Sequence, residues 1–294
     1  MPELPEVEVV RRDLDPVVVG RTVVAVTVGR DRAVRREASP RAYVDALTGR
    51  TVAATARVGK FLVVHLADPV GPVDPPDGDA GAVVVVHLGM SGQLRVADDA
   101  AEPRLPHTHV VWHLDDGREV RFVDPRTFGQ TWCSRLAGDA RPVALAHLGP
   151  DALDGLGLGA GRTGVVADAC AGRKVAIKLR LMDQTALAGL GNIYTDEILF
   201  RAGVAPHRPA GSLTAAEVDA VATVTPTVLA AAIAARGSSL RDAQYVDATG
   251  RPGTYQEQHA VHARAGAPCP ACGRPIVRLR MGGRYASYCA GCQR

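Results

Sequence analysis

Four cysteines near the end of this sequence have the spacing that binds a metal ion. They form two Cys-x-x-Cys pairs separated by sixteen residues: Cys269, Cys272, Cys289 and Cys292. Four thiolates fill the tetrahedral shell of one Zn²⁺ and leave no position open for catalysis, so we predict one structural zinc ion. A redox pair or two buried disulfides is the alternative, and the Pro and Gly residues within the pairs favour zinc.

The segment around these cysteines is strongly basic. Residues 260–294 contain six arginines and no Asp or Glu, which gives a small metal-bound hairpin a net charge of about +6. Such a charge predicts an anionic partner, and nucleic acid is the first candidate. The whole chain carries only +3, so the remainder is mildly acidic and any DNA-binding surface must be local.

Length and composition are typical of a soluble intracellular protein. The chain has 294 residues, 47% of them apolar, which is enough for two folded domains and the small metal module. No apolar run approaches the length of a membrane span. Glu3, Glu6 and Glu8 are unlike a secretory leader, and Cys133 and Cys170 form no recognisable disulfide framework. We therefore expect a cytoplasmic protein without a membrane partner.

The first half of the chain has an N-terminal helix followed by β structure. Apolar residues at helical spacing predict an amphipathic helix over residues 3–18: Val7, Val10, Leu14 and Val17. Short Val-rich runs separated by turn residues then indicate an antiparallel sandwich or barrel between residues 22 and 133: 22–28, 61–66, 82–88, 109–114 and 119–123. Residues 68–81, rich in Pro, Gly and Asp, predict an exposed hairpin loop.

Beyond residue 136 the pattern becomes helical. Four helices are expected: 163–170, 175–184, 193–202 and 215–235. The last begins at Ser212/Thr214, with Glu217 completing a capping box.

A Gly-rich turn, Gly189–Asn192, separates the second and third of these helices. A helix–turn–helix that exposes backbone N–H groups beside basic side chains can bind a phosphate. The basic residues nearby are Arg173, Lys174, Lys178 and Arg180. A turn of this kind can also be a simple corner between helices.

A series of short motifs runs along the whole chain. In order they are Met1-Pro-Glu-Leu-Pro-Glu6, Gly59-Lys60, His87-Leu-Gly-Met90-Ser-Gly92, Asp124-Pro-Arg126-Thr-Phe128-Gly129, Leu190-Gly-Asn192-Ile-Tyr194 and the terminal cysteines. In this order they are specific, and the chain resembles the bacterial formamidopyrimidine-DNA glycosylases of the Fpg/Nei family. The resemblance implies an α+β multidomain fold with three parts. These are an N-terminal helix and antiparallel β-sandwich (1–135), a helix-two-turn-helix domain (136–259) and a C-terminal β-hairpin zinc finger (260–294).

The activity implied by the resemblance is that of a bifunctional DNA glycosylase/AP lyase of base excision repair. Such an enzyme removes oxidised purines, 8-oxoguanine and formamidopyrimidines, from duplex DNA through an imine of its N-terminal proline. It then cleaves the strand by β,δ-elimination, and it acts as a monomer on damaged double-stranded DNA.

Two alternatives remain open. One is an endonuclease VIII-type relative that prefers oxidised pyrimidines, against which Leu4 and the intact Met90, Arg126 and Phe128 argue. The other is a non-catalytic zinc-finger DNA-binding protein in which the motifs are scaffold. Retention of three candidate catalytic residues argues against it: Pro2, Glu3 and Lys60.

The resemblance assigns the reaction at the sugar to Pro2 and Glu3. Removal of Met1 leaves Pro2 as a secondary amine that would attack the sugar C1′, and an α-amino group titrates low enough to be partly neutral. Glu3 would be the general acid that assists opening of the sugar ring. Taken alone, a proline at this place can simply start a helix, and an acidic first turn can simply complement its dipole.

Strand cleavage would involve Lys60 and Arg284. Lys60 is one of three lysines among 34 basic residues, which suggests a task that arginine cannot perform, namely giving up a proton. The family uses this lysine as a proton donor in β-elimination and as a phosphate contact; a chance surface lysine is the simpler interpretation. Arg284, five residues before Cys289, matches the arginine that assists δ-elimination and holds the phosphate. We expect its role to be electrostatic.

Seven further residues match DNA contacts of the family. An enzyme that acts on a base removes it from the stack and leaves a hole. Met90 and Phe128 would fill the hole and Arg126 would hydrogen-bond the orphaned base, although a methionine is more often core filler. The other four would contact the DNA backbone: His87, His107, Arg173 and Asn192. A histidine within a β run, such as His87, is often only structural.

Two segments depart from the family pattern. The loop at 68–81 is longer than usual, and residues 253–264 lack some of the expected aromatics. Residues 238–255 correspond to the loop that covers the flipped base, so changes there bear on the damage preference rather than on the chemistry.

Overall fold

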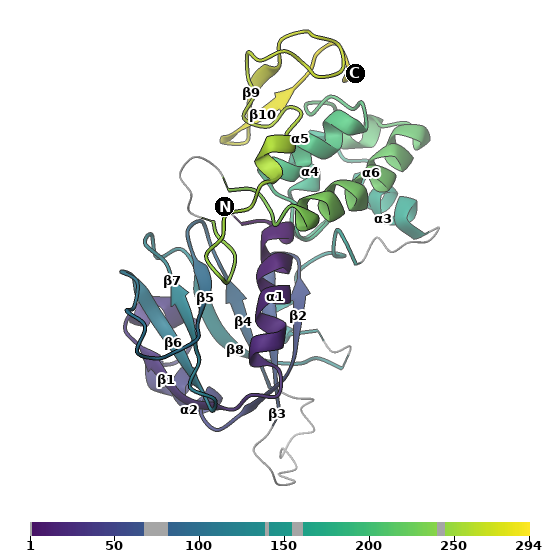
Figure 1. Ribbon diagram of the computed structural model, residues 1–294. Helices are drawn as coiled ribbons and strands as arrows, with labels where there is room; N and C mark the ends of the chain where they lie inside the picture. The colour runs from purple at the N-terminus through teal and green to yellow at the C-terminus, as the bar shows by residue number, and fades with distance from the viewer. Residues whose placement is uncertain (1, 68–81, 139–140, 155–160, 240–244) are drawn as a thin grey trace. The chain divides into compact units, whose positions relative to one another are not determined.

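The computed structural model describes residues 2–67, 82–138, 141–154, 161–239 and 245–294. The loop predicted at 68–81 lies outside these residues. The chain forms two compact units, of which the first comprises Met1–His147 and Arg236–Gly253. The second comprises Leu148–Ala235 and Thr254–Arg294, and contains the helices that follow the β-sandwich and the C-terminal hairpin (Figure 1).

Helix α1, Leu4–Val18, confirms the N-terminal helix and covers part of unit 1 (Figure 1). Val7, Val10 and Leu14 are buried as expected from the sequence, whereas Val18 is buried and the expected Val17 is only partly buried. Pro5 lies in the first turn, where its missing N–H group costs nothing. The helix packs on two strands that follow it in the chain, β2 (Thr51–Val58) and β3 (Phe61–Ala67).

The described residues of unit 1 form two four-stranded sheets in which every pairing is antiparallel. The first has the order β2-β3-β4-β8, completed by β4 (Ala82–His87) and β8 (Gln130–Arg135). The second has the order β1-β6-β7-β5: Val23–Val28, Thr108–Leu114, Glu119–Val123 and Gln93–Ala97. Their facing apolar side chains, with those of α1, make one core. The predicted fold class is therefore confirmed.

Several elements of unit 1 were not expected from the sequence. Three are the strands β2, β5 and β8, which lack a Val-rich run. The others are helix α2, Pro40–Leu47, capped by Ser39, and two short 3₁₀ turns, η1 (Asp31–Val34) and η2 (Val143–Leu145). Segment η1 contacts β8.

Residues 236–253 return from the helical region to unit 1. Tyr245 and Ala248 join its core, and the Ala248 carbonyl accepts a hydrogen bond from the Val96 nitrogen at 3.0 Å. Arg236 forms ion pairs with Asp13 of α1 and with the buried Asp247. These contacts join residues that are far apart in the sequence. The sequence alone therefore did not predict that this segment packs on the β-sandwich.

Unit 2 is helical, with a terminal hairpin. Its helices are α3 (Gly161–Cys170), α4 (Ile177–Leu181), α5 (Asn192–Arg201) and α6 (Ala215–Ala234), with 3₁₀ turns η3 (Ala210–Ser212) and η4 (Tyr255–Gln258). The helix predicted over 175–184 is shorter than expected. The capping box of Thr214 and Glu217 at the start of α6 is confirmed. The hairpin pairs β9 (Val277–Met281) with β10 (Arg284–Tyr288).

Helix α6 is long and apolar enough to cross a membrane by length and composition, contrary to the expectation that no such run exists. However, it packs against α3 and α5, and its residues Val221, Ala222 and Leu229 are fully buried. This packing is that of the central helix of a folded domain.

Candidate functional site

The N-terminus is held in place by a buried carboxylate. Glu6, 1% exposed, accepts a hydrogen bond from the Glu3 nitrogen at 2.8 Å and another from the Ser238 nitrogen at 2.8 Å. The backbone beside Pro2 is therefore fixed by both the helix start and the returning segment. Pro2 itself is buried and precedes the helix, so the helix-starting role belongs to Pro5.

Glu3 is 2% exposed and is the residue immediately before the first turn of α1. The positive end of the helix dipole therefore lies next to both Pro2 and Glu3. The sequence assigned Glu6 only a dipole-complementing or orienting role. The structure shows that it also joins α1 to a segment more than 230 residues away in the chain.

Lys60 lies in the turn between β2 and β3 and is 7% exposed. The turn is supported by Arg57, which donates to the Gly59 carbonyl at 3.1 Å and to Glu8 at 3.3 Å. Burial acts to raise the pKa of Glu8, but hydrogen bonds from the adjacent arginines of α1 and the charge of Arg57 outweigh it and lower the pKa to about 2. Glu8 is therefore an anion at neutral pH and holds Arg57 beneath this turn.

His87 ends strand β4, where it pairs with Phe61, the residue after Lys60. Burial, followed by the positive charges of Lys60, Arg36 and Arg35, lowers the pKa of His87 to about 4. The imidazole is consequently neutral at physiological pH. It can donate one hydrogen bond to a phosphate without adding a charge to a site that is already basic.

Met90, Arg126 and Phe128 are exposed on two loops that pack together. Met90 is 39% and Phe128 is 44% exposed, and the Arg126 guanidinium carbon lies 5.0 Å from the centre of the Phe128 ring. A Cβ added at Gly89 would lie 2.5 Å from the Gly129 nitrogen, so only glycine permits this approach of the two backbones.

A buried aspartate connects these loops. Asp124 accepts hydrogen bonds from the Gly129 nitrogen at 2.7 Å and from the Ser91 hydroxyl at 2.5 Å. The Ser91 oxygen also accepts from the Arg126 nitrogen at 3.2 Å. Asp124 is fully buried, so these contacts fix the backbone from which Arg126 projects. The sequence did not predict the roles of Asp124 and Ser91, although both residues lie within the short motifs described above.

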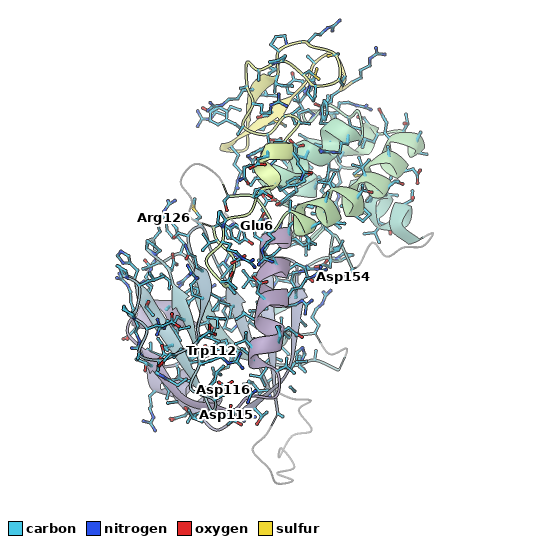
Figure 2. The ribbon with its side chains drawn as sticks, in the orientation of Figure 1. Glu6, Trp112, Asp115, Asp116, Arg126 and Asp154 are labelled. Carbon is cyan, nitrogen blue, oxygen red and sulfur yellow. The ribbon has the colours of Figure 1, made fainter. Side chains whose placement is uncertain are left out.

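Figure 2 shows that Arg126 and Glu6 lie toward one end of unit 1. Trp112, Asp115 and Asp116 lie toward the opposite end. Arg126 therefore lies at the end of unit 1 where α1 begins, rather than near the β6–β7 turn that carries the two aspartates.

His107 is exposed in the turn before β6, with a positive φ of 65°. Its carbonyl accepts from the Asp124 nitrogen at 3.0 Å, and His109 contacts the Asp124 carbonyl at 2.9 Å. His107 is thereby placed beside the turn that carries Arg126. A residue other than glycine adopts such a positive φ when the surrounding structure holds its backbone.

In unit 2, the basic residues near the helix–turn–helix divide into two groups. Arg173 and Lys174 are exposed after α3. Lys178 is fully buried, forms an ion pair with Asp196 and donates to the Tyr285 carbonyl at 3.2 Å. Arg180 donates to the Ala169 carbonyl at 2.6 Å. The expectation that all four lie at a phosphate site is therefore wrong for Lys178, which is fully buried.

Asn192 is the first residue of α5, directly after the capping Gly191. Its side-chain oxygen is buried and has no hydrogen-bond partner within the described part of the protein. The N-terminus of a ten-residue helix lies beside it, and the positive end of such a helix favours an anion.

The four cysteines fit one zinc ion. Their sulfur atoms all lie within 4.8 Å of one another, and none of the four forms a disulfide. The Cys269–Cys292 and Cys272–Cys289 sulfur separations are 3.8 and 3.4 Å. A tetrahedron with Zn–S bonds of about 2.3 Å has sulfur separations of about 3.8 Å. The predicted structural zinc is thus supported by the geometry of its ligands.

Arg284 begins strand β10, opposite Met281, and is exposed. The hairpin that carries it is anchored by the cysteine cluster at one side and by the contact between Lys178 and the Tyr285 carbonyl at the other. The candidate residues are distributed between the units. Unit 1 holds Pro2, Glu3, Lys60, His87, Met90, His107, Arg126 and Phe128, and unit 2 holds Arg173, Asn192, Arg284 and the cysteines.

Comparison with protein families identifies three consecutive domains in this chain. Residues 1–131 match the formamidopyrimidine-DNA glycosylase N-terminal domain, and residues 148–244 match the formamidopyrimidine-DNA glycosylase H2TH domain. Residues 266–294 match the zinc finger found in FPG and IleRS.

Relatives of similar length match this chain from end to end. The formamidopyrimidine-DNA glycosylase of Laribacter hongkongensis is 42% identical over the full length of both chains. That of Nocardia farcinica is 44% identical and covers 100% of this chain and 98% of its own. This chain belongs to the formamidopyrimidine-DNA glycosylase family.

Solved structures agree with the assignment. The MutM (Fpg) protein of Thermus thermophilus superposes with a TM-score of 0.81 at 38% identity, covering 99% of this chain and 98% of its own. Lactococcus lactis Fpg in complex with DNA that contains N7-benzyl-Fapy-dG gives a TM-score of 0.82 at 27% identity, with 99% of both chains covered.

Proposed function

We propose that this protein is a bifunctional DNA glycosylase/AP lyase of base excision repair, acting on oxidised purines in duplex DNA. The observation that carries the proposal is the fixed N-terminus. Glu6 holds the backbone of Glu3 and places Pro2 at the start of α1. This arrangement occurs in a chain with two domains that match formamidopyrimidine-DNA glycosylase and a third that matches the zinc finger found in FPG and IleRS.

The reaction begins at Pro2, whose secondary amine attacks C1′ of the damaged nucleotide. The bond between C1′ and the base breaks, the base leaves with its electron pair, and Glu3 supplies the proton that opens the sugar ring at O4′. The result is an imine between the sugar and Pro2. The dipole of α1 disfavours the protonated form of the amine and so helps to keep it nucleophilic.

Strand cleavage follows from the same imine. Loss of a proton beside the imine carbon expels the 3′ phosphate, and a second elimination expels the 5′ phosphate. Lys60, enclosed by its turn, serves proton transfer and contacts a phosphate. Arg284 stabilises phosphate charge from the hairpin, which the zinc-bound cysteines hold in shape.

Recognition of the duplex is divided among the remaining residues. Met90 and Phe128 fill the hole left by the extruded nucleotide, and Arg126 hydrogen-bonds the base opposite. Four residues contact the DNA backbone: His87, His107, Arg173 and Asn192. We further propose that residues 1–135, 136–259 and 260–294 are the functional modules, with residues 236–253 of the second module packed on the β-sandwich. The protein acts as a cytoplasmic monomer.

The test is cleavage of a duplex that carries a single 8-oxoguanine, with and without borohydride. We expect strand cleavage without the reagent and, with it, a covalent protein–DNA adduct whose peptide maps to Pro2. A protein that retains Met1 should neither cut nor crosslink, because its Pro2 nitrogen is part of a peptide bond. An adduct at Lys60 would refute the role of Pro2.

Two other outcomes would identify the alternatives. Faster excision of an oxidised pyrimidine than of 8-oxoguanine would indicate an endonuclease VIII-type enzyme. Binding of the damaged duplex with neither cleavage nor crosslinking would indicate a non-catalytic DNA-binding protein.

A further inference from the structure

Two arginines of a short segment near the N-terminus bind the turn that carries Arg126. Arg35 donates to the Gly129 carbonyl at 2.9 Å and to the Phe128 carbonyl at 3.1 Å. Arg32 donates to the Thr127 carbonyl at 3.2 Å. Three consecutive carbonyls of the turn are thereby engaged by guanidinium groups from more than 90 residues away in the sequence.

The backbone N–H groups of the same turn are also hydrogen-bonded. The Gly129 nitrogen donates to the Asp124 carboxylate, the Arg126 nitrogen donates to Ser91, and the Thr127 nitrogen donates to the Asp124 carbonyl at 3.2 Å. The N–H groups are thus held from the Asp124 side and the carbonyls from the arginine side. A surface turn that only connects two strands usually leaves such groups to water.

The hydrogen bonds to the N–H groups and to the carbonyls together hold a strained backbone conformation in this turn. Thr127 has a φ of 54°, a left-handed conformation that a β-branched residue adopts only when its surroundings enforce it. Release of the carbonyls would let Thr127 relax toward negative φ. The flanking Arg126 and Phe128 side chains would then change direction, because they project from the same short backbone.

Positive charge is concentrated around Arg35. Burial and the positive charges of Arg32 and Arg36 lower the pKa of Arg35, while the carboxylate of Asp124 works in the opposite direction. Arg35 also donates to the Arg32 carbonyl at 2.9 Å, which ties the two together. A fork-shaped guanidinium can bind two adjacent carbonyls at once, and a lysine cannot.

We propose that Arg32 and Arg35 are positioning residues that hold the Arg126–Phe128 turn in the conformation that reads the base opposite the lesion. The inference rests on the proposed function, since the reading role of Arg126 is part of it. Neither arginine needs to touch DNA for this effect. The held turn determines how well the enzyme discriminates between bases opposite the lesion. It takes no part in the reaction at Pro2.

The experiment compares Arg35→Ala, Arg35→Lys and wild type in two assays. In hydrogen exchange of the free protein, we expect the amides of Arg126 and Gly129 to exchange about tenfold faster in Arg35→Ala, with the remaining β-sandwich unchanged. In cleavage of 8-oxoguanine opposite each of the four bases, we expect opposite-base discrimination to fall about 3- to 10-fold. Cleavage at a preformed abasic site should stay at the wild-type rate.

Arg35→Lys should restore part of both effects, because one amine can bind one of the two carbonyls. Arg41→Ala is the matched control, since Arg41 is an exposed arginine that pairs with Asp45 on its own helix. Unchanged exchange at Gly129 in Arg35→Ala would overturn the inference, whatever the activity. Faster exchange with unchanged discrimination would also overturn it. If wild type did not cut 8-oxoguanine, the proposed function would fail, and exchange would still decide whether Arg35 restrains the turn.

Discussion

At the scale of residues, Lys60 and Arg126 occupy different environments within unit 1. Lys60 is 7% exposed, and its charge contributes to the lowered pKa of His87. Arg126 is exposed on a turn with its guanidinium over Phe128. An enclosed amine suits contact with one phosphate or transfer of a proton, whereas an exposed planar fork suits the edge of a base.

Arg126→Ala should therefore weaken discrimination by the opposite base, because loss of a hydrogen bond to a base edge costs about 1–3 kcal/mol of selectivity. Lys60→Ala should leave discrimination nearly intact and should reduce both cleavage and the salt dependence of binding. The measurement is cleavage of 8-oxoguanine paired with each base, for both variants, at two salt concentrations. If Lys60→Ala lost opposite-base discrimination and Arg126→Ala kept it, the roles assigned to both residues would be wrong.

His87 should make the stability of the protein depend on pH. Its pKa is about 4 in the folded protein and near 6.5 in the unfolded chain, mainly because of burial. Below pH 6.5 the unfolded chain takes up a proton that the folded protein resists, so the free energy of unfolding falls as the pH drops toward 4. At pH 5 this contribution is about 2 kcal/mol.

Denaturant unfolding of His87→Gln at pH 7.5 and pH 5 measures this effect. Between pH 7.5 and pH 5, the free energy of unfolding of the variant should fall by about 2 kcal/mol less than that of wild type. His207→Gln, which changes an exposed histidine, should behave like wild type. Equal losses in wild type and His87→Gln would show that His87 is protonated as easily in the folded protein as in the unfolded chain.

At the scale of elements, the start of α1 depends on Glu6. Its carboxylate accepts from two backbone N–H groups, at Glu3 and Ser238, and is almost completely buried. Charge-assisted bonds of this kind contribute more than neutral ones, and a glutamine would direct an N–H group at a backbone N–H group. The returning segment and the N-terminus are thus positioned by the same side chain.

Glu6→Gln should lower the free energy of unfolding by about 1–3 kcal/mol and slow imine formation at Pro2. The stability is measured by denaturant unfolding and the chemistry by borohydride trapping over time. Glu257→Gln, at an exposed position, is the control for loss of one negative charge. An unchanged trapping rate in a destabilised Glu6→Gln protein would show that Glu6 supports the fold without positioning Pro2.

At the scale of the whole molecule, positive charge is concentrated in the zinc-binding hairpin region. Residues 260–294 carry about +6, whereas the whole chain carries +3, so the rest of the chain is slightly acidic. The affinity for DNA and its dependence on salt should therefore rely on a folded finger.

Cys272→Ser should release zinc and unfold the finger, because metal binding supplies most of the folding energy of so small a module. DNA affinity and its salt dependence should fall. The chain has two tryptophans, Trp112 and Trp132, and both lie in unit 1, so their fluorescence reports on the β-sandwich alone. That signal should show an unchanged unfolding midpoint. Cys170→Ser, a change at a free buried thiol outside the cluster, should retain zinc.

Undiminished DNA affinity after loss of zinc would locate the DNA-binding surface away from Arg284. A lowered fluorescence midpoint would show that the finger also stabilises unit 1.

The sequence by itself determined the elements whose signals are local. Helical spacing predicted α1, Val-rich runs predicted five strands, and cysteine spacing predicted the zinc cluster. These signals are read over a few residues, so they do not depend on distant partners. Strands β2, β5 and β8 were missed because their residues become strand only by pairing with better-marked neighbours.

The tertiary structure decided which side chains are available and which are committed to the fold. Lys178 has the sequence context of a phosphate contact, yet it is buried against Asp196. Glu6 has the context of a helix-start acid, yet it also holds Ser238. Arg35 has no motif, yet it binds the carbonyls of Phe128 and Gly129. Each of these roles is set by a partner elsewhere in the sequence, 18 residues away for Asp196 and more than 90 residues away for the others. Only the folded chain brings the partners together.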